Sequence, residues 1–422
     1  MLFPFNSSSR DFIRRSRRLG SALLLALACA GLSGCSSWLD GPQSIVHVDG
    51  PVARAQLNLF YTTCYVTLTI FVLVGGALAY AMIRFRSRSR HDEEGKPPAQ
   101  SHGNPVVELG LVILSLVALV FIAIPTIKDI WYTYDVPAKE RATELKIDAT
   151  GSQWWWKFEY PQEMVKLKYG GEAPLAVANE LVIPVGRPVH IELRSADVIH
   201  SFWVPKLAGK VDMIPNRANH LWLQADKPGY YFGQCAQYCG LSHAVMRFRV
   251  IALDQKEFNA WLANQMKPAR TVTGPEPTVA PKTVFTSFKR NQFGFSDKWM
   301  ATSPTSTLDL WRAQQHPNPN EDPALIAKGR KLFQEKTCFA CHTIRGHEGI
   351  GVTGPDLTHV GARTTIAGGV LENTPDELAR WISHPDRVKP GNVMYESGYL
   401  ANHITFKPGE VAALVAYLQS LK

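Results

Sequence analysis

The chain has 422 residues, 45% of them hydrophobic, and a formal net charge of +9. That length exceeds one ordinary domain and predicts two or three folded units, while the ordinary hydrophobic content confines any membrane part to local segments. The basic residues are scattered and not gathered in a stripe, so the charge gives no reason to expect a nucleic-acid partner.

The N-terminal residues have the pattern of an export signal. Arginines between Arg10 and Arg18 precede an apolar run over residues 21–30, the order that secretion signals show. The sequence Leu32-Ser-Gly-Cys35 resembles a bacterial lipobox. We therefore expect residues 1–34 to be removed and Cys35 to be acylated; an ordinary signal peptide or a further membrane helix are the alternatives.

Two uncharged apolar runs follow, at residues 61–83 and 109–127. Each is long enough to cross a hydrocarbon core of roughly 30 Å as a helix. The sequence thus predicts a transmembrane hairpin within residues 50–135, with spans at about 61–83 and 106–127. Four arginines lie in residues 84–90, and by the positive-inside rule they place this loop in the cytoplasm and both flanking ends outside.

Residues 141–265 show short segments of alternating apolar and polar residues, bounded by Gly, Pro and Asn. Several such segments at close spacing predict an antiparallel β-sandwich. Because the second span ends outside the cytoplasm, this domain is expected on the outer face.

One loop of this domain gathers soft metal-binding side chains. The run Cys235-Ala-Gln-Tyr-Cys239-Gly-Leu-Ser-His243-Ala-Val-Met246 follows His200 by thirty-five residues. Thiolates, imidazoles and a thioether suit copper, and two neighbouring cysteines can bridge two copper ions. The alternatives are a disulfide, which would stabilise little across so short a loop, and a zinc site.

Here the chain resembles subunit II of cytochrome c oxidases, which carries a dinuclear copper centre called CuA. The resemblance implies that Cys235 and Cys239 bridge the coppers and that His200 and His243 bind one each. It also implies two weak ligands, Met246 and the backbone carbonyl of Gln237. The family often has Glu at the position of Gln237, a difference to which a carbonyl ligand is indifferent.

Two further segments match the same family. Residues 151–160, with three consecutive tryptophans, resemble its aromatic segment, which implies that Trp154 or Trp155 receives the incoming electrons. Glu108, at the cytoplasmic start of the second span, resembles a family glutamate at the mouth of a proton pathway.

The C-terminal part carries a second motif. Residues 266–322 are rich in Pro, Thr, Ser and Asn and predict a linker. In residues 323–422, the run Cys338-Phe-Ala-Cys341-His342 is typical of covalent haem attachment, with both thiols on the haem and His342 on the iron.

The C-terminal part resembles small class I cytochromes c. Its run Lys389-Pro-Gly-Asn-Val-Met394 resembles their axial-methionine loop, which implies Met394 as the sixth ligand, with His347 and His384 as alternatives. Histidine–methionine ligation would raise the haem potential.

The combination resembles cytochrome c-tethered oxidases. We expect a multidomain protein: a two-helix transmembrane hairpin, an antiparallel β cupredoxin-like sandwich and an all-α cytochrome c domain. It would lie in the bacterial inner membrane with the copper and haem domains on the periplasmic face, in contact with lipid.

The resemblance implies a non-catalytic, electron-accepting role in a proton-translocating cytochrome c oxidase. A cytochrome bc complex or a soluble cytochrome c would supply electrons through the haem c to CuA and on to subunit I, assembled with subunit III, where oxygen is reduced to water. The alternatives are a CuA-containing subunit of a nitric oxide reductase, a nitrous oxide reductase and a copper chaperone or sensor.

Overall fold

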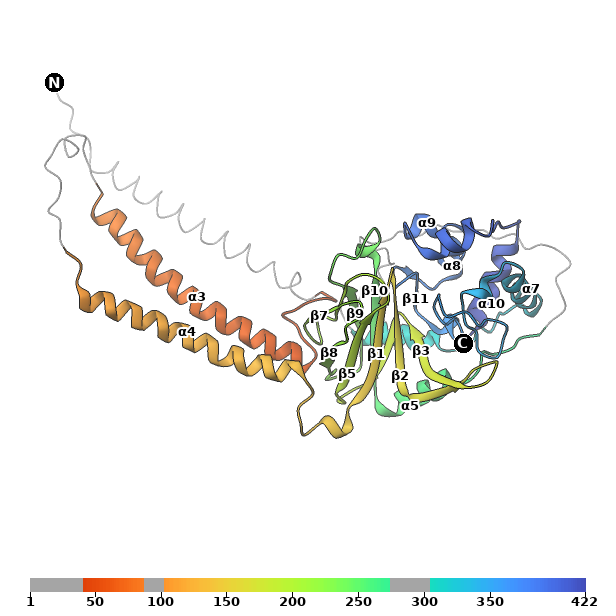
Figure 1. Ribbon diagram of the computed structural model, residues 1–422, viewed down its shortest axis with the longest axis horizontal. Coiled ribbons are helices and arrows are strands. Elements are labelled where there is room, and N and C mark those ends of the chain that lie inside the picture. Colours follow the sequence, from red (N-terminus) through yellow and green to blue (C-terminus); the bar gives the residue numbers. More distant parts are fainter. Residues whose placement is uncertain (1–40, 87–101, 274–303) are drawn as a thin grey trace, which may run out of the picture.

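The computed structural model describes residues 41–86, 102–273 and 304–422. The predicted signal peptide, Cys35 and most of the arginine-rich loop lie outside these ranges. Two long helices extend from one side of a β-sandwich, and a mainly helical domain lies on the opposite side (Figure 1).

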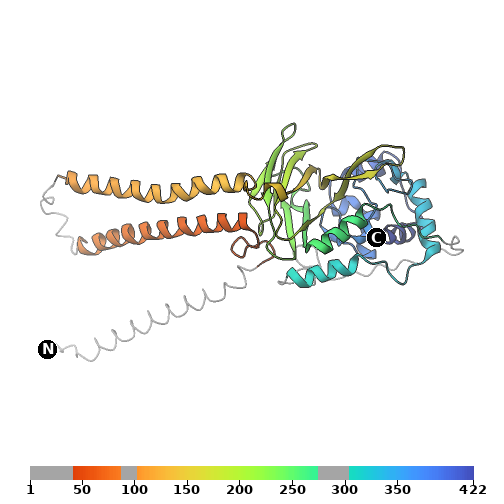
Figure 2. The ribbon, with the colours of Figure 1, turned by 90° about the horizontal axis from the view of Figure 1, so that it is seen from below.

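The helices α3 (Pro51–Arg84) and α4 (Pro105–Tyr134) lie side by side (Figures 1 and 2). Both are long and apolar enough to cross a membrane, and both predicted spans fall inside them. Their apolar side chains are exposed along the hairpin, for example those of Phe71 and Leu116, as lipid-facing residues are. Asn104 caps α4 by accepting a hydrogen bond from the Val106 N–H at 3.0 Å.

The outer end of α4 is joined to the sandwich. The indole of Trp222 donates a hydrogen bond to the carbonyl of Tyr132 at 3.0 Å, and the two rings pack edge to face with their centroids 5.5 Å apart. The hairpin and the sandwich therefore meet through a packed contact and not only through the chain.

The sandwich has two five-stranded sheets, ordered β3-β2-β1-β5-β8 and β4-β10-β9-β6-β7. Its strands are β1 (Leu145–Ser152), β2 (Trp155–Lys166), β3 (Glu172–Ala178), β4 (Glu180–Pro184), β5 (Val189–Ser195), β6 (His200–Trp203), β7 (Lys210–Met213), β8 (Asn219–Leu223), β9 (Gly229–Cys235) and β10 (Arg247–Leu253). Short 3-10 turns lie at Arg141–Thr143 and His243–Val245, and α5 (Gln255–Gln265) follows β10.

The predicted sandwich is confirmed, but its sheets are mixed and not purely antiparallel. Strand β1 pairs in parallel with β5, with Ile147 opposite Ile191, and β10 pairs in parallel with β4. These partners are distant in sequence. The alternating pattern reveals strands and hairpins, but it contains no signal for the direction of such long-range pairs.

The core between the sheets is aromatic. Trp156, Phe158, Phe202 and Phe248 are completely buried, and the ring centroids of Phe202 and Phe248 are 4.7 Å apart. Burial of each such ring contributes about 1.5–3 kcal/mol. This packed core holds the strand ends from which the copper loop, residues 235–246, projects.

The C-terminal domain is built from α7 (Pro323–Glu335), α8 (Pro375–Ser383), α9 (Pro385–Val388) and α10 (Glu410–Ser420). It also has 3-10 turns at Cys338–Ala340 and Val360–Ala362, a π-helical turn at Met394–Leu400, and a short hairpin of β11 (Thr365–Ile366) and β12 (Leu371–Glu372). Helices α7 and α10 cross closely, since a Cβ on Gly329 would lie 2.7 Å from Cβ of Tyr417.

The range predicted as a linker contains ordered structure. Its first residues lie on the C-terminal domain, where the Ala269 N–H donates to the Arg345 carbonyl at 2.8 Å. Helix α6 (Pro304–Gln314) returns to the sandwich, and its Leu308 and Trp311 are buried in the sandwich core. The chain thus crosses from one domain to the other more than once.

Candidate metal centres

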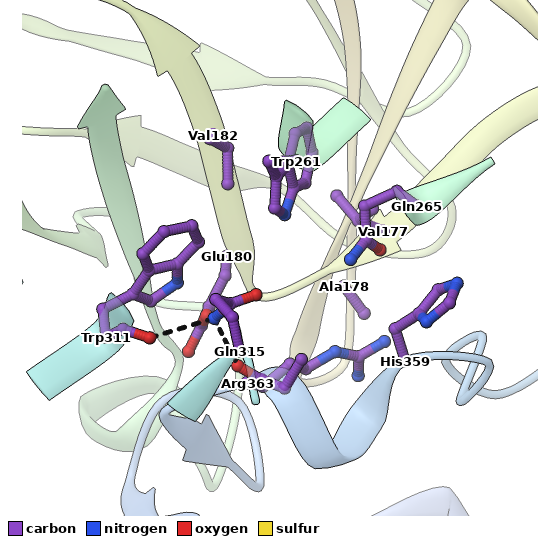
Figure 3. A pocket seen from close by; sticks show the side chains of 11 residues that line it. Val177, Ala178, Glu180, Val182, Trp261, Gln265, Trp311, Gln315, His359 and Arg363 are labelled. Atoms are coloured by element: carbon purple, nitrogen blue, oxygen red, sulfur yellow. Dashed lines mark hydrogen bonds between the residues drawn. The ribbon is translucent and has the colours of Figure 1, made fainter. Parts of the chain in front are cut away.

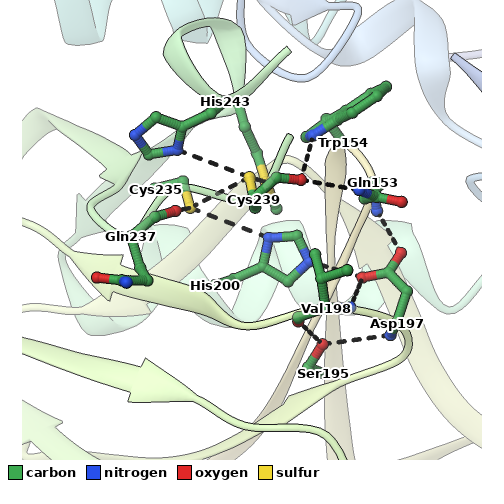
Figure 4. Close-up of polar contacts among 11 residues, drawn as sticks. Gln153, Trp154, Ser195, Asp197, Val198, His200, Cys235, Gln237, Cys239 and His243 are labelled. Atoms are coloured by element: carbon green, nitrogen blue, oxygen red, sulfur yellow. Dashed lines mark hydrogen bonds and ion pairs between the residues drawn. The ribbon is translucent and has the colours of Figure 1, made fainter. Parts of the chain in front are cut away.

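The side chains predicted to bind copper converge at one end of the sandwich (Figure 4). His200 begins β6 and Cys235 ends β9, and these strands are neighbours, with Phe202 opposite Cys235. The loop from β9 to β10 supplies the remaining side chains. The fold therefore brings His200 to a loop that lies far from it in the sequence.

The two thiols face each other without being bonded. The sulfur atoms of Cys235 and Cys239 are 3.8 Å apart, far beyond the roughly 2.05 Å of a disulfide. Both residues are buried. The structure therefore has two free thiols at this site and not a disulfide.

An imidazole stands beside each thiol. Nδ1 of His200 lies 3.9 Å from Sγ of Cys235, and Nδ1 of His243 lies 3.6 Å from Sγ of Cys239. The ligand atoms of His200, Cys235 and Cys239 all lie within 4.8 Å of one another. A metal ion placed among them would have thiol and imidazole ligands on both sides.

The far side of the His200 ring is held by an aspartate. Its Nε2 donates a hydrogen bond to Oδ1 of Asp197 at 2.8 Å, so the lone pair of the ring is on Nδ1, which faces the sulfur atoms. Such partners orient ligating histidines and strengthen them as bases. Asp197 was not predicted from the sequence, although its position three residues before His200 was a usable signal.

Two weaker donors complete the set. The carbonyl oxygen of Gln237 lies 3.2 Å from Sγ of Cys235, and the completely buried sulfur of Met246 lies 3.8 Å from Sγ of Cys239. The structure thus brings all six predicted copper-site residues together.

The electrostatics of the thiol pair favour a bound cation. The Cys239 thiol, together with His200, lowers the pKa of Cys235, whereas the neighbouring Cys235 and burial raise the pKa of Cys239. The two thiols thus oppose each other's ionisation, so that two thiolates side by side are unfavourable without a cation. A bound metal supplies the positive charge that allows both thiols to ionise.

The donor set fits copper better than zinc. Structural zinc sites are closed by four sulfur, nitrogen or carboxylate ligands, whereas a buried thioether and a carbonyl are the additional weak ligands of copper sites. Two sulfurs flanked by two imidazoles allow two copper ions to share both thiolates.

The three tryptophans take different positions. Trp156 lies in the sandwich core, Trp155 is half-buried, and Trp154 precedes β2 beside the copper loop. The Trp154 indole donates a hydrogen bond to the carbonyl of Cys239 at 3.1 Å, and Gln153 donates to the same oxygen at 2.8 Å (Figure 4). Trp154 therefore touches the backbone of a predicted copper ligand.

The haem motif follows α7 directly. Cys338 and Cys341 are both free of disulfides, and Nδ1 of His342 donates a hydrogen bond to the carbonyl of Pro355 at 2.8 Å. Nε2 thus keeps its lone pair, as an iron ligand must. Burial lowers the pKa of His342, which also favours the neutral ring. These residues fit a covalently attached haem.

The sixth iron ligand stays a prediction. Met394 is half-buried at the start of the π-helical turn, and the loop before it is braced by Asn392, which donates to the Lys389 carbonyl at 2.7 Å. His347 is not available as an alternative, because Tyr417 and Thr271 occupy its two nitrogens at 2.9 and 3.1 Å. His384 lies at the C-terminal end of α8.

The two domains meet around a buried carboxylate that was not predicted from the sequence. Oε1 of Glu180, in β4, accepts hydrogen bonds from the backbone and hydroxyl groups of Thr364 and Thr365 at 2.6–3.2 Å. A cavity of about 20 Å³ lies beside it (Figure 3), enough for about one water molecule. Burial raises the pKa of Glu180.

The same interface covers Trp154. The hydroxyl of Ser242 donates to the carbonyl of Pro390 at 2.8 Å, and a Cβ on Gly391 would lie 3.1 Å from Cη2 of Trp154. The loop before Met394 thus lies directly on the indole, which is only 6% exposed.

Glu108 lies in the first turn of α4 and is exposed. That turn is at the end of the hairpin away from the sandwich (Figure 1). The position agrees with a location at the cytoplasmic surface, but its role in a proton pathway stays a prediction, and Cys35 lies outside the described residues.

Known families match both domains. Residues 145–253 match the family described as "Cytochrome C oxidase subunit II, periplasmic domain", and residues 326–422 match the cytochrome c family. The chain is 31% identical to cytochrome c oxidase subunit 2 of Alkalihalophilus pseudofirmus, with 93% of this chain and 94% of that protein covered. It is 28% identical to the corresponding subunit of Bacillus subtilis, with 95% and 97% covered.

Among solved structures, the chain is similar to the periplasmic domain of subunit II of cytochrome oxidase from Bradyrhizobium japonicum. The identity is 34%, with 29% of this chain and 92% of that chain covered and a TM-score of 0.25.

Proposed function

The chain belongs to the cytochrome c oxidase subunit II family, and from that premise we propose which of its residues carry electrons and in which order. The chain is the electron-accepting subunit of a haem–copper oxidase, with a haem c on its C-terminal domain and CuA on its sandwich. When bound, these groups supply one-electron chemistry. The observation that carries the proposal is the unbonded pair of buried sulfurs, flanked by two imidazoles.

The copper ligands are the six residues of the loop and strand. Cys235 and Cys239 would hold both copper ions, His200 and His243 would each hold one, and Met246 with the Gln237 carbonyl would bind more weakly. Cys338 and Cys341 would hold the haem, and His342 and Met394 would bind its iron.

Trp154 connects the two centres. It contacts the loop that leads to Met394 on one side, and on the other side it donates a hydrogen bond to the carbonyl of Cys239. Packed atoms and one hydrogen bond thus connect the haem domain to a residue that would bind copper. Among the described residues, Trp155 makes no hydrogen bond to the copper loop, so Trp154 is the better candidate.

The burial of Trp154 makes the order of transfer obligatory. Because the C-terminal domain covers the indole, a separate donor protein has no access to it and delivers its electrons to the haem. A variant with Cys338→Ser and Cys341→Ser would keep its copper but lose oxidation of a reduced soluble cytochrome c. Retention of the original rate would show that donors reach the copper domain directly.

The wider assignments follow the family. The chain lies in the inner membrane with both metal domains on the periplasmic face and Cys35 acylated. It assembles with subunits I and III, Glu108 opens a proton pathway, and a cytochrome bc complex or a soluble cytochrome c is the donor. A nitric oxide reductase subunit is disfavoured, because the relatives that match almost the whole chain are cytochrome c oxidase subunits.

Two measurements on the purified oxidase complex test the assignment. The copper signal in electron paramagnetic resonance should show one electron shared by two copper nuclei; the pattern of a single copper would refute the dinuclear site. Trp154→Phe should slow electron transfer from haem to copper while both cofactors stay bound, and Trp155→Phe is the matched control. Equal rates in both variants would remove Trp154 from the path.

A further inference from the structure

A buried lysine lies at the junction of the two metal domains. Lys389 is 2% exposed, and its ammonium group donates hydrogen bonds to the carbonyl of Trp154 and, at 2.9 Å, to the carbonyl of Ala367. Among the described residues, no carboxylate lies within ion-pair distance of it. Burial disfavours the charged amine and lowers the pKa of Lys389 to about 7, although the nearby Cys239 acts in the opposite direction.

The surrounding backbone is shaped to admit this side chain. Gly368, in the turn between β11 and β12, has a φ of +68°, and a Cβ there would collide with the lysine Nζ and lie 2.7 Å from the Trp154 carbonyl. Ala367 and Gly369 also have positive φ values, 54° and 74°. Only a turn that nearly lacks side chains lets the amine, the carbonyl and the hairpin meet.

The turn is itself fixed to the sandwich. The Arg247 N–H donates to the Gly368 carbonyl at 2.8 Å, and the buried Arg249 guanidinium donates to the Gly369 carbonyl at 3.2 Å. Lys389 therefore joins three parts that belong to different elements: its own loop next to Gly391, the anchored hairpin and the backbone of Trp154.

We propose that Lys389 is a positioning residue for electron transfer. It holds Trp154 against the haem-domain loop and thereby sets the rate of electron transfer from the haem to the copper centre. This inference rests on the proposed function. In the step concerned, one electron passes from the reduced haem iron, which is oxidised, to the copper centre, which is reduced; no bond forms or breaks. Lys389 acts through Trp154 and does not itself carry the electron.

The role differs from simple attachment of the domains. The Glu180 contacts are made by Thr364 and Thr365, at the start of the same hairpin, and they do not include Trp154. Loss of a Glu180 contact would weaken docking without moving the indole, whereas loss of the Lys389 amine would release the Trp154 carbonyl. The two effects can be separated by variants.

The experiment uses the full oxidase complex with both cofactors bound. Lys389→Met keeps the length and burial but removes the donor; Lys389→Gln keeps a neutral donor. Thr365→Val removes one hydroxyl contact to Glu180, and Lys407→Met changes an exposed lysine of the same domain. Haem-to-copper transfer, both reduction potentials and the thermal midpoint are measured for each.

We expect Lys389→Met to slow the transfer on the order of tenfold, because displacements of about 1 Å at a reacting geometry have effects of that size or larger. Lys389→Gln should restore part of the rate. Thr365→Val should lower the thermal midpoint at an unchanged rate, and Lys407→Met should match the wild type in both.

The proposal is overturned if Lys389→Met transfers electrons at the wild-type rate, or if Thr365→Val slows transfer as much as Lys389→Met does. It is also overturned if changed reduction potentials account for the whole effect. Absence of copper or haem from the wild-type complex would instead refute the proposed function, so the two failures are distinguishable.

Discussion

The copper loop and the Glu180 contact are both buried clusters of polar groups, and they differ in how their atoms are paired. At Glu180, four donors converge on one carboxylate oxygen. In the copper loop, sulfur atoms, ring nitrogens and a carbonyl oxygen converge, and almost all of them offer electron pairs. Hydrogen-bond donors matched to an acceptor satisfy one another, so the contact of Glu180 with Thr364 and Thr365 is a joint between the two domains. Groups that offer electron pairs and face one another instead need a bound cation. The difference identifies a binding site without reference to any relative.

The largest effect is expected from Cys235→Ser. A hydroxyl is a poor ligand for copper, so loss of one bridging sulfur should abolish the dinuclear site, with copper content by mass spectrometry as the measure. Cys64→Ser is the matched control, because Cys64 is an exposed cysteine in α3. Full copper content in Cys235→Ser would contradict the site.

Asp197→Asn should act less strongly on the same site. The amide still contacts the His200 ring but no longer supplies a negative charge, and loss of such a supporting partner lowers metal affinity by about ten- to a hundredfold. Competition with a copper chelator measures the change. Asp212→Asn, at an exposed carboxylate in β7, should leave the affinity unchanged.

At the joint, Glu180→Ala should cost about 1–3 kcal/mol of unfolding free energy, since buried threonine donors lose their acceptor. Copper and haem contents should stay at wild-type values. Loss of copper from this variant would mean that the joint and the binding site are not independent.

The two clusters should also respond to pH in opposite directions. The raised pKa of Glu180 means that its contribution to stability is fully present below the ordinary pKa of a glutamate and declines as pH rises through the folded-state value. The copper loop loses metal as pH falls, because protons compete for its ligands. Relative to Glu180→Gln, which does not titrate, the wild type should become less stable with rising pH; a constant difference would contradict this.

The smallest effect is expected from Gly391→Ala. The residue has a φ of +76°, where a side chain costs about 1–2 kcal/mol, and the new methyl group would press on Trp154. Gly398→Ala is the control, because nothing lies within 4 Å of its Cβ position. Thermal unfolding of both variants should separate them, and identical midpoints would count against the close packing.

Much of this arrangement could be predicted from sequence, and the limits have a physical cause. The spans, the sandwich and the two cofactor motifs depend on local patterns: apolar runs, alternation, and short spacings such as Cys235 to Cys239. The parallel pairing of β1 with β5 and the return of α6 to the sandwich depend on contacts between distant residues. No local pattern encodes them.

The site shows the same division. His200 was grouped with the copper-type loop from the sequence, but its contact with Cys235 requires β6 and β9 to be neighbours. Glu180 and Lys389 were missed because a lone Glu or Lys in a sequence is ordinarily a solvated surface residue. Only Lys389 had a signal in the sequence, namely the glycines Gly368 and Gly391. The structure explains these glycines, because a side chain at either position would collide with Lys389 or press on Trp154.

The return of α6 to the sandwich limits how the protein can be divided for study. A soluble copper fragment that ends at residue 265 would lack Leu308 and Trp311, which complete its core, and would present an apolar surface to water. A cytochrome fragment that begins after the predicted linker would lose the contact of Ala269 with Arg345. Biochemists who wish to isolate either half should therefore keep the intervening segment with both.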